Sequence, residues 1–156
     1  MSNQTFKPVI KLAEVQAKYV RSIDFETKTR KIGGSRELER FIRPFYDRDQ
    51  IAYRESFFAM YFSRANEIIS VFKCSEGGVS GCFVDAKLIL AQALIAGASG
   101  IAVCHNHPSG NLYPSDADKK LTIRLKEACS FMDMILIDHI ILTPNSYFSF
   151  MDDGIL

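Results

Sequence analysis

Short stretches in which apolar and polar residues alternate, or in which aromatic and β-branched residues gather, occur along the chain and indicate strands. The segments of this kind are residues 14–21, 55–63, 67–75, 134–142 and 147–150. Only Arg64, Ala65 and Asn66 separate the second segment from the third, which predicts a tight hairpin. A turn at residues 143–146 separates the last two segments, and residues 79–84 predict a further strand.

Three other segments carry the start and stop signals of helices. The first begins at Ser35, in an N-cap position, and has apolar residues at helical spacing as far as Phe45. Asp85 can cap the second helix, which runs to about Ala96. The third helix covers residues 115–130. Its predicted inward-facing residues are Leu121, Leu125, Ala128 and Cys129.

The apolar run at residues 101–104 follows Gly100 and has no polar position, which is typical of a strand buried on both faces. Helices that alternate with hairpin-connected strands predict an α/β fold, with a mixed β-sheet flanked by helices. A chain of 156 residues is long enough for one compact domain. We expect this domain to cover residues 35–156, after an N-terminal extension at residues 1–34 that includes a strand.

The composition is that of an ordinary globular protein. The formal net charge is +1, with 47% apolar and 24% charged residues, which excludes a wholly disordered chain, a collagen and a membrane protein. Between Lys28 and Arg40 the basic residues alternate with Glu37 and Glu39, which favours a solvated surface over a nucleic-acid patch. The four cysteines form no Cys-x-x-Cys pair and are interpreted as small buried residues.

The first residues of the chain lack the apolar core of a signal peptide, and no stretch reaches the length of a membrane span. Together with the cysteine pattern, this favours a reducing cytoplasmic location.

Candidate chemistry is concentrated at residues 104–118, which hold two of the three histidines. His105 and His107 are two residues apart, so in an extended backbone both rings point to the same side and can reach one ion. Asp118 lies three residues after Ser115, within the first turn of the predicted helix. Two imidazoles and one carboxylate leave an open position on a tetrahedral Zn²⁺, as in catalytic sites.

Each part of this pattern also has a purely structural interpretation. Ser115 and Asp118 match a capping box, which stabilises a helix start without any catalytic role. A His-x-His pair alone is more often a polar loop than a metal site. The combination of His105, His107, seven intervening residues, Ser115 and Asp118 is what favours a metal centre.

With an upstream glutamate, this combination resembles the signature of the JAMM metallohydrolases. The sequences His-Asn-His-Pro-Ser-Gly at 105–110, Pro-Ser-x-x-Asp at 114–118 and Asp-His-Ile at 138–140 are similar to the RadC branch of that superfamily. The resemblance extends from about Ser35 to Leu156. It implies a JAB/MPN architecture, similar to that of cytidine deaminases, and Zn²⁺ held by His105, His107 and Asp118.

The resemblance also implies two catalytic residues. Glu55 precedes the apolar run of a strand, as the glutamate of the family does, and would act as the general base and acid. Glu67 and Glu76 are less suitably placed, and the structural interpretation of Glu55 is a polar strand end. Ser115 would stabilise the oxyanion. His139 is interpreted either as a group that supports the site or as a core histidine.

Two features depart from the RadC pattern. Residues 1–34 are too few and too strand-like for the DNA-associated helix-hairpin-helix segment that RadC proteins usually carry, which weakens a connection with nucleic acid. The sequence at Val84 to Lys87 replaces the Pro-Arg-Glu commonly found in relatives.

We therefore expect a JAMM-type zinc hydrolase that cleaves a peptide or isopeptide amide in a peptide or protein substrate. The alternatives are a DNA-repair-associated RadC-like accessory protein and a catalytically silent binding module. A zinc nucleobase deaminase is excluded because the chain lacks the His-x-Glu and Pro-Cys-x-x-Cys sequences.

Overall fold

The computed structural model describes residues 31–78 and 83–156 of the chain. These residues form five strands, three α-helices and one 3-10 turn. In chain order the elements are α1 (Ser35–Ile42), η1 (Arg43–Phe45), β1 (Ser56–Phe62), β2 (Ile68–Glu76), α2 (Ala86–Ala96), β3 (Gly100–Asn106), α3 (Asp116–Phe131), β4 (Ile135–Leu142) and β5 (Tyr147–Ser149).

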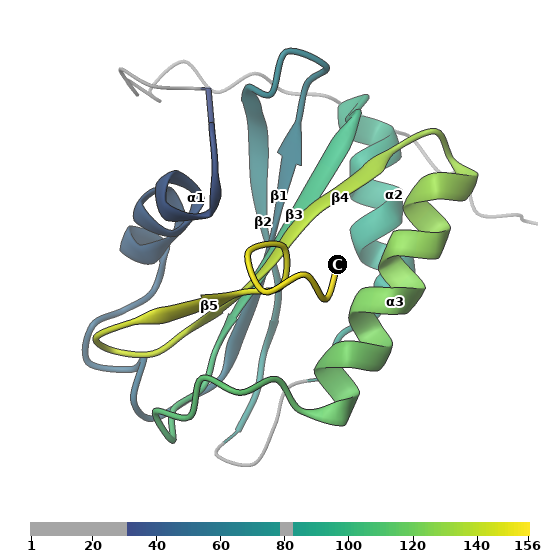
Figure 1. The fold of residues 1–156 in the computed structure, drawn as a ribbon. Coiled ribbons are helices and arrows are strands. Elements are labelled where there is room, and N and C mark those ends of the chain that lie inside the picture. The colour runs from purple at the N-terminus through teal and green to yellow at the C-terminus, as the bar shows by residue number, and fades with distance from the viewer. Residues whose placement is uncertain (1–30, 79–82) are drawn as a thin grey trace, which may run out of the picture.

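The strands form one mixed sheet in the order β2-β1-β3-β4-β5, as Figure 1 shows. The β1–β2, β1–β3 and β4–β5 pairs are antiparallel, whereas β3 and β4 are parallel. The parallel pair requires a crossover connection, which α3 provides. The predicted mixed sheet flanked by helices is confirmed.

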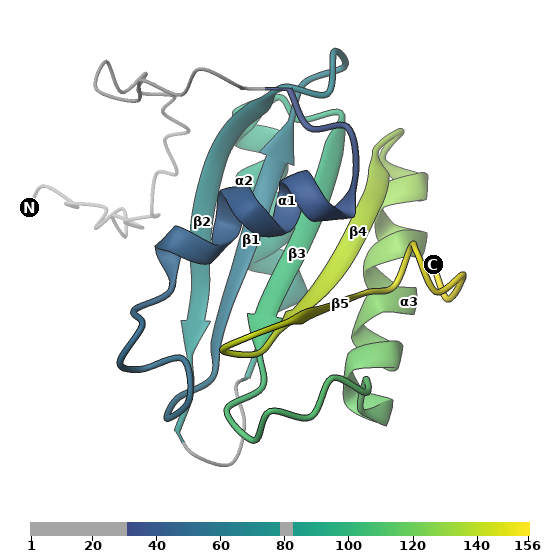
Figure 2. The same cartoon turned by 60° about the vertical axis from the view of Figure 1, so that its left-hand side comes forward.

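Helices cover both faces of the sheet. α1 lies on one face, and α2 and α3 lie side by side on the other (Figures 1 and 2). Every residue of the central strand β3 is buried, as its apolar sequence predicts. Successive side chains of β3 enter different cores: Cys104 packs on the α1 side, and Val103 on the side of α2 and α3.

Local signals explain where the helices begin and end. The Asp85 carboxylate accepts a hydrogen bond from Lys87 N, and Gly97 ends α2 in the left-handed conformation with φ 64°. Ser115 caps α3 as predicted. The prediction for Ser35 is wrong, because Gly34 is the N-cap of α1 and Ser35 is its first residue. The Ser35 hydroxyl instead donates to Asp152 at 2.5 Å, which ties α1 to the C-terminal turn.

Two other predictions concern segments that the structure does not describe, or describes only in part. The strand predicted at residues 14–21 lies within residues 1–30, outside the described part of the chain, and so does most of the extension predicted at residues 1–34. The strand expected at 79–84 is also mostly outside it, and its described residues Phe83 and Val84 are not in a strand.

The described cysteines fit their interpretation as buried residues. Cys104 and Cys129 are buried free thiols, and Cys74 is partly buried. Burial raises the pKa of the Cys129 thiol to about 11, so it is not a reactive thiolate at neutral pH. None of the helices within residues 31–78 and 83–156 has the length and apolar character needed to cross a membrane.

The end of β3 is held from the α1 side by Tyr46. The Tyr46 hydroxyl donates to the carbonyl oxygen of Cys104 at 2.9 Å in a buried environment. Its ring packs edge-on against Phe58 of β1, with the ring centroids 4.8 Å apart. Tyr46 therefore links the segment after α1 to the strand residue that precedes His105.

Replacing Tyr46 with phenylalanine should lower the free energy of unfolding by about 1 kcal/mol, because the ring stays while its buried hydrogen bond is lost. Urea unfolding followed by circular dichroism measures this change. Tyr53→Phe is the matched control, since Tyr53 is 54% exposed and should give a change close to zero. Equal stabilities of the two variants would contradict this assignment.

Candidate metal centre

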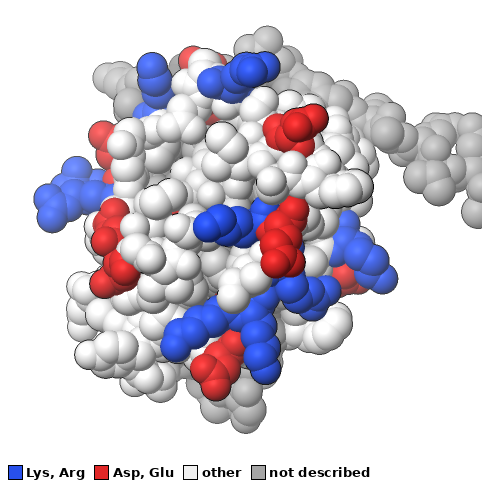
Figure 3. All heavy atoms as spheres, turned by 45° about the vertical axis from the view of Figure 1, so that its right-hand side comes forward, with Lys and Arg blue, Asp and Glu red and all other residues white. Residues whose placement is uncertain are grey.

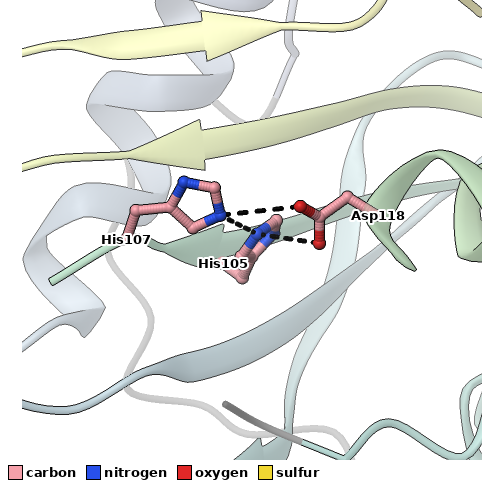
Figure 4. Close-up of side chains that lie close together, drawn as sticks. All are labelled: His105, His107 and Asp118. Carbon is pink, nitrogen blue, oxygen red and sulfur yellow. Dashed lines mark hydrogen bonds and ion pairs between the residues drawn. The ribbon is translucent and has the colours of Figure 1, made fainter. Parts of the chain in front are cut away.

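His105, His107 and Asp118 come together at the carboxyl end of β3, as Figure 4 shows. His105 is the penultimate residue of β3, and His107 follows it directly after the strand. The His107 backbone N–H still donates to Leu142 O of β4 at 2.8 Å, so the sheet pairing continues through this residue. Asp118 comes from the first turn of α3.

The separations among the three side chains suit a single metal ion. The two Nε2 atoms are 3.0 Å apart, His105 Nε2 is 3.2 Å from Asp118 Oδ1, and His107 Nε2 is 3.6 Å from Asp118 Oδ2. Ligand atoms that bind a tetrahedral ion at about 2.1 Å lie about 3.4 Å from one another. The observed values lie around this distance, so the three residues could hold a metal.

The donor chemistry also fits a cation. His107 Nδ1 lies 2.6 Å from Asn111 O, a carbonyl that can only accept, so this nitrogen carries a proton. The His105 Nδ1 atom faces His139 at 2.9 Å, on the side of the ring opposite Asp118. Both Nε2 atoms therefore turn toward the Asp118 carboxylate. The lone pairs of these nitrogens and the carboxylate oxygens of Asp118 repel one another. The arrangement is therefore stable only when a proton or a metal ion lies among these atoms.

The pKa values of Asp118 and His107 reflect the need for a positive charge beside the carboxylate. Burial alone would raise the pKa of the Asp118 carboxyl, but the contacts with the His105 and His107 imidazoles and the hydrogen bond from Ser115 outweigh burial and hold that pKa well below its usual range. The hydrogen bond with Asp118 is the main cause of a raised pKa at His107. A proton shared here in the metal-free protein would leave when a metal binds.

Ser115 forms the capping box that was the alternative interpretation of this sequence. Its backbone N–H donates to Asp118 Oδ2 at 2.8 Å, and Asp118 N donates to Ser115 Oγ at 3.2 Å. The Ser115 hydroxyl also donates to Asp118 Oδ2 at 2.5 Å. The cap thus holds the carboxylate that faces the histidines, so the structural and functional interpretations are compatible. A role of Ser115 in oxyanion stabilisation stays a prediction.

Glu55 lies immediately before β1 and is half-buried. Phe57 pairs with His105 in the antiparallel β1–β3 ladder, and its ring stacks on the imidazole with centroids 5.6 Å apart. Burial raises the pKa of the Glu55 carboxyl; the charges of His105 and His107 oppose this rise, and that of Asp118 adds to it. Glu55 is therefore an electrostatic neighbour of all three candidate ligands.

Asn106 holds the backbone on both sides of Glu55. Its amide Nδ2 donates to Ile51 O and to Arg54 O, each at 2.7 Å. Its Oδ1 accepts from Ser56 N at 2.7 Å. Because side chains alternate along a strand, Asn106 faces away from the metal group. The sequence pattern does not indicate this role, because the partners of Asn106 lie 50 or more residues earlier.

These observations define the class of this protein as an α/β domain that gathers two histidines and an aspartate at one strand end. Comparison with known families agrees, since the profile described as "RadC-like JAB domain" matches residues 33–155. The chain belongs to this family.

Curated relatives from several bacteria carry the name "UPF0758 protein". The relative from Flavobacterium johnsoniae is 43% identical over 101 residues, which cover 65% of this chain and 44% of the relative. The relative from Porphyromonas gingivalis is 39% identical over 127 residues, covering 80% of this chain and 54% of the relative. The chain spans about half the length of the curated relatives it matches.

Replacing Asn106 with alanine should lower the free energy of unfolding by about 3 kcal/mol, because one buried carbonyl, one part-buried carbonyl and one part-buried N–H lose their partner. Chemical denaturation measures the loss. Asn145→Ala, in the exposed β4–β5 turn, is the matched control and should change stability by less than about 0.5 kcal/mol. A loss below about 1 kcal/mol for the Asn106 variant would show that other contacts hold this segment.

The raised pKa of His107 predicts a pH dependence in the metal-free protein. A folded-state pKa above the unfolded value gives stability that is complete below about pH 6.5 and is lost as pH rises through the folded value. The stability difference between the parent and His107→Gln, measured in EDTA, should therefore shrink by up to about 1 kcal/mol from pH 6 to pH 9. A difference that grows with pH would contradict the shared proton.

Proposed function

We propose that this protein is a zinc-dependent hydrolase of the JAMM type that cleaves an amide bond in a peptide or protein. The observation that carries the proposal is the convergence of His105, His107 and Asp118, with Glu55 as their electrostatic neighbour. Two imidazoles and one carboxylate form the ligand set of many catalytic zinc sites. A closed structural site would instead use four protein ligands.

The chemistry divides between the ion and the chain. When bound, zinc supplies Lewis acidity and lowers the pKa of a coordinated water to about 7. His105, His107 and Asp118 would hold the ion. Glu55 would take the proton of the attacking water on a carboxylate oxygen and pass it to the leaving amine nitrogen. Its raised pKa suits this exchange, because a group that both accepts and donates a proton works best near the working pH.

Ser115 would assist at the substrate carbonyl. Its hydroxyl donates to Asp118 Oδ2, and a turn about the Cα–Cβ bond of Ser115 would direct this O–H to the substrate carbonyl oxygen as negative charge develops there. The backbone N–H groups of the first turn of α3 add partial positive charge at the same end.

A peptide or protein substrate is supported by the surface charge as well as by the family. On the face shown in Figure 3, several Lys and Arg side chains gather in the lower half of the view, with Asp and Glu side chains among them. A binding surface for a nucleic-acid backbone usually has a continuous basic stripe.

Hydrolysis can be tested on a mixture of peptides, so that no single substrate has to be chosen. Zinc-loaded protein is incubated with a proteome-derived peptide library in H₂¹⁸O, and mass spectrometry identifies new C-termini that carry one ¹⁸O. Products that form with the parent and disappear with a chelator would support hydrolysis. If the zinc-loaded parent yields no such products from peptides or from isopeptide-linked ubiquitin dimers, the proposed reaction is wrong.

Replacing Glu55 with glutamine should leave zinc binding unchanged and lower the rate of ¹⁸O incorporation at least about 100-fold, because the proton acceptor is lost. Glu67→Gln is the matched control, since Glu67 is exposed beyond the other end of β1 and should keep full activity. Retained activity in Glu55→Gln would assign the proton transfer to another group.

A further inference from the structure

A buried chain of three side chains runs from the metal group into the protein. His105 Nδ1 is 2.9 Å from His139 Nε2, and His139 Nδ1 is 2.7 Å from Thr122 Oγ1. Thr122 Oγ1 is in turn 2.7 Å from the backbone oxygen of Asp118. His105 and His139 are fully buried and Thr122 is 2% exposed. The chain therefore begins at one candidate ligand on β3 and ends at the backbone of another on α3.

The positions of the protons follow from the chemistry of the end group. A carbonyl oxygen only accepts, so the single hydroxyl proton of Thr122 is directed to Asp118 O. The Thr122 oxygen must then accept a proton from its other neighbour. His139 Nδ1 is consequently the donor in that contact.

His139 carries this one proton only. Its ring stacks on Phe150 at a centroid distance of 4.7 Å and meets Phe57 edge-on at 5.7 Å. Its two ring nitrogens face Thr122 and His105 and not a carboxylate, and an unpaired charge in such a buried place would be costly, so the ring is neutral. A neutral ring protonated at Nδ1 offers its Nε2 lone pair, so it accepts from His105 Nδ1. His105 in this tautomer has an unprotonated Nε2 atom that points to Asp118.

We propose that Thr122 and His139 are positioning residues that fix the tautomer of His105, so that its Nε2 lone pair is ready to bind the metal. The proposal rests on the metal site of the proposed function, and it does not depend on which bond is cleaved. Outer partners of a metal-bound histidine generally set ring orientation and tautomer in this way. Here the partner is a second histidine, which itself needs the threonine to define its protons.

The alternative is that Thr122 and His139 only fill the core. Thr122→Val distinguishes the two roles, because valine has nearly the same shape but cannot accept a hydrogen bond. Without an acceptor at Nδ1, His139 would move its proton to Nε2 and donate it to His105 Nδ1. The proton of His105 would then lie on Nε2, where it blocks the metal.

The experiment compares zinc affinity in the full chain, measured by competition with a chromophoric chelator. Thr122→Val should weaken zinc binding about 10- to 100-fold. Thr122→Ser, which keeps the hydroxyl, should bind zinc within about threefold of the parent. Cys129→Ala is the matched control for lost packing: Cys129 is buried in the same helix, and its variant should also bind within about threefold.

A second measurement reads the tautomer directly in the metal-free protein. Two-bond ¹H–¹⁵N spectra should show His105 protonated at Nδ1 in the parent and in Thr122→Ser, and protonated at Nε2 in Thr122→Val. A core-filling role would leave these spectra unchanged among the variants.

The possible outcomes separate a failure of the tautomer proposal from a failure of the metal site. Equal zinc affinity of the parent and Thr122→Val, or a His105 proton on Nε2 in the parent, would overturn the tautomer proposal alone. A parent that binds no zinc would overturn both the tautomer proposal and the metal site. Weakened binding in Thr122→Val supports the tautomer proposal even where no hydrolysis is found.

Discussion

The structure depends on the need to satisfy two polar side chains at the buried end of β3. His105 and Asn106 are both fully buried, and a buried polar group without a partner is costly. Strand alternation sends them to opposite faces of the sheet. His105 meets His107, Asp118 and His139 on the side of α3, while Asn106 binds the segment around Glu55 on the side of α1. Satisfying these two residues brings the candidate ligands and the candidate base to one strand end.

The parallel pairing of β3 with β4 explains why an aspartate from a helix reaches this position. The crossover through α3 begins beside the end of β3, so the capped first turn of the helix places Asp118 next to the histidines. β4 pairs in parallel with β3 and places His139 within hydrogen-bonding distance of His105. Membership in the RadC-like JAB family is consistent with this arrangement.

The parts of the site that depend on local spacing could be predicted from the sequence. His105 and His107 share one side of an extended backbone, and Ser115 and Asp118 share one helical turn, so their positions follow from the chain itself. The five strands of the described sheet could also be predicted, because apolar runs such as residues 101–104 have few alternatives in a buried sheet. Signals at helix starts were less decisive: the serine at position 35 resembles a cap, yet the preceding glycine takes that role.

The supporting residues were not predictable because their partners are distant in the sequence. Asn106 bonds to residues 50 or more positions earlier, and the contact between His105 and His139 spans 34 residues. Thr122 lies on the inward face of α3, where the helical pattern predicts apolar neighbours such as Leu125. No pattern in the neighbouring sequence indicates that Thr122 contacts a histidine. Only the packing of α3 against β4 reveals why a hydroxyl is needed there.

The most direct test of the account is the zinc content of the purified, dialysed protein beside that of His107→Ala. Asp116→Asn serves as a further control, because Asp116 is an exposed neighbour of Asp118 in the same helical turn. The account predicts about one zinc per chain in the parent and in Asp116→Asn, and almost none in His107→Ala. Equal zinc content in the parent and His107→Ala, or no zinc in either, would contradict the assignment of this group as a metal centre.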